Sequence, residues 1–177
     1  MPFNDATLVP MRRRTWLKLG LVGGAVVALG GGVLALIRPG WTEGRLTPPG
    51  RELFTAVART VLAGLLPAGD EAQSALQAHL ERLEDAVRAM PAVVQAEISE
   101  LTALLLHPLG RHALTGLAVE WREATPAELA PALQGLRESK LALRQQIYHA
   151  LRDLTNGAYF ADRSAWRDIG YPGPRPV

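Results

Sequence analysis

Residues 47–66 read TPPGRELFTAVARTVLAGLL and predict an amphipathic helix with a defined start. Thr47 is a suitable N-cap, and the two prolines that follow it fit the first helical turn. Apolar side chains then recur three and four residues apart, which places them on one helix face: Leu53, Phe54, Val57, Ala58, Val61, Leu62, Leu65 and Leu66. The turn-forming residues 67–70, PAGD, are expected to end this helix.

The same helical spacing recurs through the middle of the chain. Apolar positions continue at Leu76, Leu80, Leu83, Val87 and Met90, and then at Val94, Ile98, Leu101 and Leu105. Pro91 separates these two runs, residues 107–110 end the second, and residues 111–121 predict a further helix. Three successive helices are therefore expected after the first.

The last long helical region begins with a capping box, Thr125-Pro126-Ala127-Glu128. It is expected to reach about Phe160, with a break near Gly135 or Ser139. Its predicted inner face is Leu136, Lys140, Leu143, Ile147, Leu151 and Leu154, with the lysine amine extended outward to water. No segment alternates apolar and polar residues as a strand does. The expected fold class is all-α, a compact bundle of about five to seven helices over residues 47–160.

Composition excludes several classes of site. Of the net charge of +2, residues 1–37 contribute +3, so the rest of the chain has a net charge of −1. A domain without a basic surface is not expected to bind nucleic acid. The chain has no cysteine, which excludes disulfides, covalent c-type haem and cysteine-ligated iron–sulfur or zinc sites.

Residues 1–18 contain a basic motif, Arg13-Arg14-Thr15-Trp16-Leu17-Lys18. It resembles the twin-arginine (Tat) export signal, in which a receptor reads paired arginines followed by a bulky apolar pair and often a lysine. The candidate export residues are Arg13, Arg14, Trp16, Leu17 and Lys18, and the expected partner is the Tat translocation machinery.

Residues 19–37 form an uncharged run of 19 residues that includes six glycines. As a helix this run would span about 28 Å, close to the thickness of the hydrocarbon core. The glycine content favours a Tat signal, and a plain transmembrane anchor is the alternative. In either case the basic residues 12–18 are expected to stay cytoplasmic, as the positive-inside tendency predicts.

We expect this signal to remain on the protein as an anchor. A cleavage site needs small residues after the apolar run, but the small triplet Ala28-Leu29-Gly30 lies inside it. The domain would then be exported and held on the periplasmic side of the bacterial inner membrane. Residues 38–46, which contain proline and glycine without periodicity, are expected to be a linker.

The C-terminal residues 159–177 differ from the helical segments in composition. They hold four of the ten aromatic residues, more than an irregular tail buries by itself. Asp162 is a candidate cap for a short helix through Trp166, and residues 170–174, GYPGP, must be non-helical. Trp166 and Tyr171 are expected either to pack back on the bundle or to dock on a partner, where such rings are favoured anchors.

These features together resemble the small subunit of exported flavin-dependent sugar and alcohol dehydrogenases, such as subunit 3 of gluconate 2-dehydrogenase. The likeness lies in the Tat motif, the small helical domain and the 161–177 tail, which follows the pattern aromatic-aromatic-x-D-x-x-x-W-x-x-I-G-Y-P-G-P from residue 159 on. The helix that ends Leu65-Leu66-Pro67 is also similar.

The resemblance implies a non-catalytic escort. Such a subunit carries no flavin, brings a catalytic FAD subunit of the glucose-methanol-choline type through the Tat route, and stays bound to it. The implied partner-binding residues fall in the tail motif: Tyr159, Phe160, Trp166, Tyr171, Pro172, Gly173 and Pro174. No residue of this chain is implied to be catalytic, or to bind a cofactor or metal.

The residues themselves also give no pattern typical of a catalytic site. The four histidines, His79, His107, His112 and His149, form no metal-binding helical pair, and no Gly-rich loop follows a strand. The acidic residues Glu81, Glu84, Asp85, Glu97 and Glu100 are expected on solvated helix faces. The alternative function is a stand-alone membrane-tethered helical binding domain without an oxidoreductase partner.

Overall fold

The computed structural model describes residues 39–167 and 169–173. This part of the chain holds six α-helices, one 3₁₀ helix and a two-stranded hairpin. The hairpin consists of β1 (Trp41–Thr42) and β2 (Arg45–Leu46). The helices are α2 (Pro48–Val61), α3 (Glu71–Arg88), α4 (Ala92–Leu106), α5 (Pro108–Thr115), α6 (Pro126–Arg137), α7 (Ala142–Phe160) and the 3₁₀ helix η2 (Arg163–Trp166). The expected all-α bundle is confirmed in its helical content.

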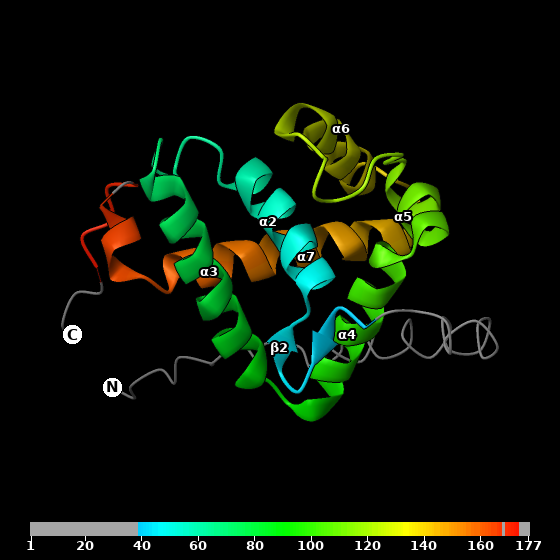
Figure 1. Cartoon of the computed structure of the whole chain (residues 1–177), viewed down its shortest axis with the longest axis horizontal. Helices are drawn as coiled ribbons and strands as arrows, with labels where there is room; N and C mark the ends of the chain where they lie inside the picture. The colour runs from blue at the N-terminus through cyan, green and yellow to red at the C-terminus, as the bar shows by residue number, and fades with distance from the viewer. Residues whose placement is uncertain (1–38, 168, 174–177) are drawn as a thin grey trace, which may run out of the picture.

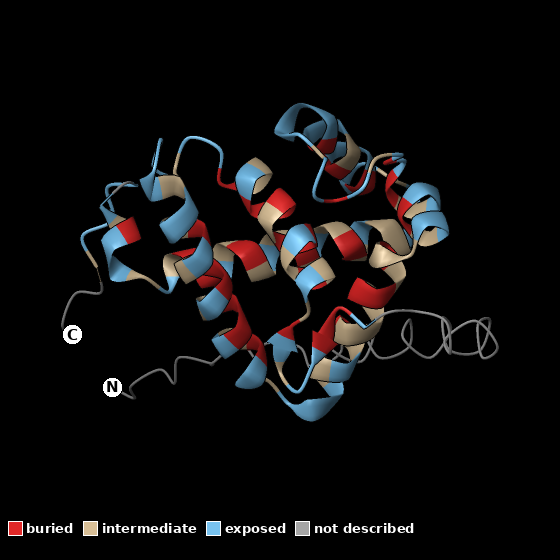
Figure 2. Ribbon diagram, viewed as in Figure 1, coloured by how far each residue is buried: buried red, intermediate tan, exposed pale blue. Residues whose placement is uncertain are grey.

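Helix α7 is the central element of the bundle (Figure 1). It packs against α2, α3 and α6 and runs from the end of the molecule that carries α5 to the end that carries η2. The buried residues lie along the surfaces that these helices turn toward one another (Figure 2). Among the fully buried side chains are Leu53, Phe54, Leu83, Ile147 and Leu151. These are positions that helical spacing assigned to inner faces.

Two helix starts agree with their sequence signals. The Thr47 side chain accepts a hydrogen bond from the Gly50 amide, and two prolines occupy the first turn of α2. At α6 the capping box is complete, because the Thr125 hydroxyl accepts from the Glu128 amide while the Glu128 carboxylate accepts from the Thr125 amide. These hydrogen bonds satisfy amides that have no partner inside the helix.

The segment expected to be a linker is instead part of the fold. Residues 41–46 form an antiparallel hairpin in which Trp41 pairs with Leu46, and both side chains are buried. Trp41 packs edge-on against Phe54 of α2, with ring centroids 6.0 Å apart. A hairpin this short has no alternating pattern to detect, so neither its strands nor its place in the core followed from the sequence. The globular unit therefore begins before residue 47.

Glycine permits the close approach of this segment to α2 and α4. A β-carbon on Gly40 would lie 2.6 Å from the Thr102 β-carbon, and one on Gly50 would lie 2.2 Å from the Gly40 carbonyl oxygen. Both distances are too short for any side chain, so both positions require glycine.

Three helix boundaries differ from the sequence expectation. Helix α2 ends at Val61 rather than near Leu66, and Gly64 in the following turn has a positive φ of 85°. Helix α5 begins at Pro108 and ends at Thr115, where Gly116 adopts a left-handed conformation, so residues 116–121 are not part of it. Lys140 lies exposed in the turn between α6 and α7 rather than on an inner face.

Glu84 is a further correction, because it is buried rather than solvated. Its carboxylate accepts a hydrogen bond from the Leu46 amide of β2 and lies 2.7 Å from a terminal nitrogen of Arg51 on α2. A buried carboxylate needs such partners to offset its lost hydration. Helical spacing alone does not reveal that the hairpin covers this face of α3.

Candidate functional site: the C-terminal tail

The end of α7 is fixed to the turn between α2 and α3. Tyr159 is buried, and its hydroxyl donates to the Leu65 carbonyl over 3.0 Å. Its ring packs edge-on against Phe160, with centroids 5.2 Å apart. Around them a second apolar cluster, separate from the main core, contains Ala58, Leu62, Leu76, Tyr159 and Ala165. This cluster supports the tail.

An arginine of α3 holds the start of the tail. The Arg82 Nε donates to the Ala158 carbonyl over 3.1 Å, and a terminal nitrogen lies 3.3 Å from the Asp162 carboxylate. The same carboxylate accepts from the Ser164 amide and hydroxyl, which caps η2 as expected. Hydrogen bonds from Ser164, together with the Arg82 charge, lower the pKa of Asp162.

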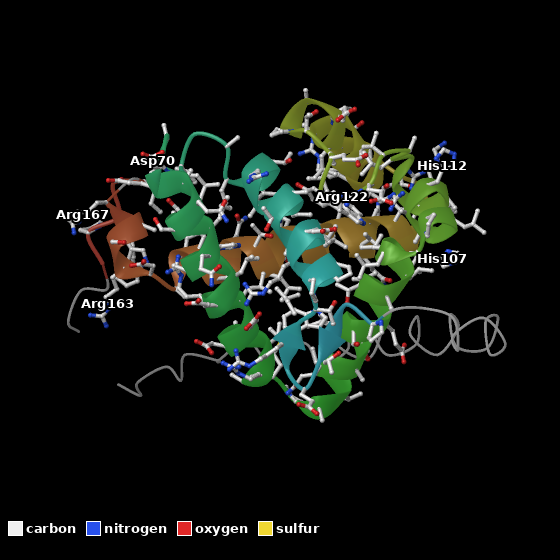
Figure 3. All side chains as sticks on the ribbon, viewed as in Figure 1. Asp70, His107, His112, Arg122, Arg163 and Arg167 are labelled. Atoms are coloured by element: carbon white, nitrogen blue, oxygen red, sulfur yellow. The ribbon has the colours of Figure 1, made fainter. Side chains whose placement is uncertain are left out.

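The tail folds around Trp166. Its indole nitrogen donates to the Phe160 carbonyl over 2.8 Å, and its carbonyl accepts from the Tyr171 amide. The Tyr171 ring meets the indole edge-on, with centroids 5.4 Å apart, and the Arg163 guanidinium lies 5.8 Å from the indole centroid. Gly170 and Gly173 both have positive φ, which lets the chain turn back on the indole. Figure 3 shows Arg163 and Arg167 projecting from this end of the molecule.

The tail leaves apolar side chains in contact with solvent. Ile169 is 53% exposed and Tyr171 is 46% exposed, whereas Ala165 of the same tail is buried in the second cluster. The two alternatives for the aromatic residues, packing on the protein itself and docking on a partner, therefore apply to different residues. Tyr159 is buried in the second cluster and Trp166 packs within the tail, whereas Tyr171 has one side on Trp166 and the other free.

Six of the seven predicted tail residues are described, and they occupy three different settings. Tyr159 and Phe160 belong to the last turn of α7, and Trp166, Tyr171 and Gly173 come together in the tail. Pro172 is exposed, and Pro174 lies outside the described residues. Sequence reasoning did not assign Arg82, which anchors the tail from another helix, because no local pattern links residues 82 and 162.

An open groove of about 590 Å³ adjoins the tail. The α2–α3 turn, α3 and the tail contribute its walls, which include Leu65, Pro67, Ala78, Arg82, Tyr159 and Asp162. A second hollow of about 480 Å³ adjoins the same turn and shares Gly64 and Pro67 with the groove. The groove combines apolar walls with one ion pair, a surface suited to a protein segment.

His79 is the one strongly perturbed titratable group in the part of the chain described. It is fully buried in α3, and neither ring nitrogen has a hydrogen-bond partner there. Burial, with a smaller effect of the Arg82 charge, lowers its pKa to about 4. It is therefore a neutral core residue near neutral pH. His107 and His112 lie on or beside α5, at the end of the molecule opposite Arg163 and Arg167 of the tail (Figure 3).

Residues 39–167 and 169–173 contain no group of three His, Asp or Glu side chains that could hold a metal ion. Within the same ranges no helix is both long and apolar enough to cross a membrane. The export residues Arg13, Arg14, Trp16, Leu17 and Lys18, and the apolar run 19–37, lie outside the described residues. Comparisons with protein-family models, curated proteins and solved structures gave no match.

Proposed function

We propose that this chain is a non-catalytic escort subunit that carries an FAD-dependent dehydrogenase through the Tat route and anchors it outside the inner membrane. The observation that carries the proposal is the tail. It is an ordered platform, built on Trp166 and attached by Arg82, that presents Ile169 and Tyr171 to solvent. An aromatic ring held at the surface by an ordered segment is a favoured anchor for a partner protein.

The two ends of the sequence supply complementary parts of this function. The motif at Arg13-Arg14 provides an export address, and the tail provides a surface for a partner that lacks one. The FAD belongs to that partner, and the substrate class is a sugar or an alcohol.

Export is tested by replacing Arg13 and Arg14 with lysine. The receptor reads paired guanidinium groups, and lysine does not reproduce their planar donor geometry. We expect the double variant and its flavoprotein to stay in the cytoplasm in cell fractionation, while an Arg12→Lys control is exported. Normal periplasmic accumulation of the double variant would exclude Tat dependence and leave a simple anchor.

Docking is tested by purifying the chain from its own cells and measuring bound flavin by absorbance. Ile169→Asp should reduce the flavin that co-purifies, because burying a new charge at an interface is unfavourable. Val93→Asp is the matched control, since Val93 is 65% exposed and lies on α4, whereas the tail packs on α7 and is held by Arg82 of α3. Wild-type protein without any flavoprotein would refute the assignment, and equal loss in both variants would remove the tail as the docking surface.

The groove beside the tail favours one second candidate. With a volume of about 590 Å³ and mixed apolar and charged walls, it would suit a stand-alone tethered domain that binds an exported peptide. The same purification separates the two functions, because a peptide-binding domain would retain no flavin.

A further inference from the structure

The first described residues, Pro39 and Gly40, are hydrogen-bonded to the bundle. The Thr47 hydroxyl donates to the carbonyls of Pro39 and Gly40 over 2.9 and 3.2 Å, and the Thr47 amide donates to the Gly40 carbonyl over 3.0 Å. Gly40 also packs against Thr102 of α4, as its lack of room for a β-carbon requires. Residues 39 and 40 are therefore fixed to the bundle.

Only Arg38 separates this fixed point from the apolar run that ends at Ile37. Two residues apart in sequence, the α-carbons of Ile37 and Pro39 are at most about 7 Å apart. As a transmembrane helix this run of 19 residues would span about 28 Å, so a bilayer core of about 30 Å would take up all of it. Pro39 must then lie within the headgroup layer, which is about 5–8 Å thick on each side of the core.

The surface beside the entry point suits a lipid headgroup layer. Gly40 contacts the last turn of α4, where an added β-carbon would lie 3.3 Å from Leu106. Three residues later, at the start of α5, Leu109 is 76% exposed, the largest exposed fraction among the large apolar side chains described. Residues 101–119 contain no carboxylate, and their titratable side chains are His107, Arg111 and His112. This segment has no negatively charged side chain that would repel the phosphate groups of lipids.

We infer that the bundle rests directly on the outer surface of the membrane through the end of α4 and through α5, with Leu109 inserted among the headgroups. This inference rests on the anchored form of the proposed function. The bundle would then have a single orientation relative to the membrane and would not move freely on a flexible linker.

That orientation separates the two interaction surfaces. Figure 3 shows His107 and His112 at one end of the long axis and Asp70, Arg163 and Arg167 at the other. With α5 on the membrane, the tail faces away from the lipid, where a large water-soluble subunit has room to dock.

The absence of cysteine makes a labelling test straightforward. Leu109→Cys and Asp70→Cys are made in the full chain, labelled with an environment-sensitive fluorophore and reconstituted in phosphatidylcholine vesicles. Doxyl-labelled phosphatidylcholine is then added as a quencher. We expect loss of fluorescence at position 109 and none at position 70, whose side chain is exposed at the opposite end.

A third sample separates tethering from chance contact. A flexible Gly/Ser insertion between Arg38 and Pro39 in the Leu109→Cys chain should restore most of the fluorescence, because the bundle is then free to move from the surface. Equal quenching at both positions, or no quenching at position 109 in vesicle-bound protein, would overturn the inference. So would a mature protein that lacks residues 19–37. In each of these cases flavoprotein co-purification still reports separately on the escort function.

Discussion

The entry hairpin, residues 39–47, and the C-terminal tail, residues 161–173, are similar in composition and attachment but differ in burial. Each is a short segment outside the α-helices with one tryptophan, and each is bound to α3 by one charged side chain. Trp41 is 7% exposed in the main core, and Glu84, which holds the hairpin, is buried. Trp166 is half-buried, and Arg82, which holds the tail, is partly exposed.

The difference shows which segment the bundle needs. The hairpin packs on both α2 and α4, and its Trp41 covers the Phe54 ring, so its removal would expose Phe54 of the core. The tail adds Ala165 to the smaller cluster at the end of α7 and leaves Ile169 and Tyr171 exposed. The hairpin is part of the core, and the tail is a platform built on it.

The sharpest test of this contrast is Trp41→Ala. Truncating a buried tryptophan costs about 3–5 kcal/mol of unfolding free energy. Trp166→Ala, at a half-buried site, should cost clearly less. Urea unfolding of the full chain in detergent, followed by circular dichroism, measures both. If Trp41→Ala leaves no folded protein, Trp41→Phe gives a smaller measurable loss, and equal losses at the two tryptophans would contradict the distinction.

Acid is expected to have an intermediate effect on the free energy of unfolding. The reason is that α3, which holds both segments, carries the buried His79. The pKa of His79 is about 4 in the folded chain and 6.5 when exposed. As the pH falls below 6.5 the unfolded chain binds a proton that the folded chain does not, so the free energy of unfolding decreases until about pH 4. At pH 5 the expected loss from this group is about 2 kcal/mol relative to pH 8.

Replacing His79 by leucine removes this dependence. The free energies of unfolding at pH 8 and pH 5 should differ less in His79→Leu than in wild type. His112→Gln, at an exposed site, should show the same decrease between the two pH values as wild type. An unchanged loss in His79→Leu would show that other groups cause the acid sensitivity.

The smallest effect on stability is expected at the outer ring of the tail. Tyr171→Ala removes an edge-on aromatic pair worth about 0.5–1.5 kcal/mol, and the exposure of the ring favours the lower value. Thermal unfolding measures this change, and Tyr171→Phe, which keeps the ring, should show none. A loss as large as that of Trp166→Ala would mean that Tyr171 supports the fold rather than a docking surface.

Much of the fold was predictable because its signals are local. Capping at Thr47 and Thr125, the apolar faces of α2, α3 and α7, and the Asp162 cap of η2 each depend on residues within a few positions of one another. The break between α6 and α7 lies at residues 138–141, close to the expected Ser139. The tail sequence also indicated an aromatic element with non-helical turns.

The contacts that define the site were not predictable in this way. Tyr159 and Leu65 are 94 positions apart, and Arg82 and Asp162 are 80 apart, so no periodicity relates them. The assignment of Glu84 to a solvated face failed for the same reason, because Leu46 and Arg51 reach it from another part of the chain.

The sequence by itself determined that the domain is helical, the apolar faces of its main helices and the caps at Thr47, Thr125 and Asp162, since hydrogen bonding and side-chain spacing within a few residues decide these features. The tertiary structure alone decided that residues 39–46 belong to the core and that Tyr171 and Ile169 stay outside it. Burial depends on which distant surface a side chain meets, and the tryptophans of the two short segments meet different surfaces here.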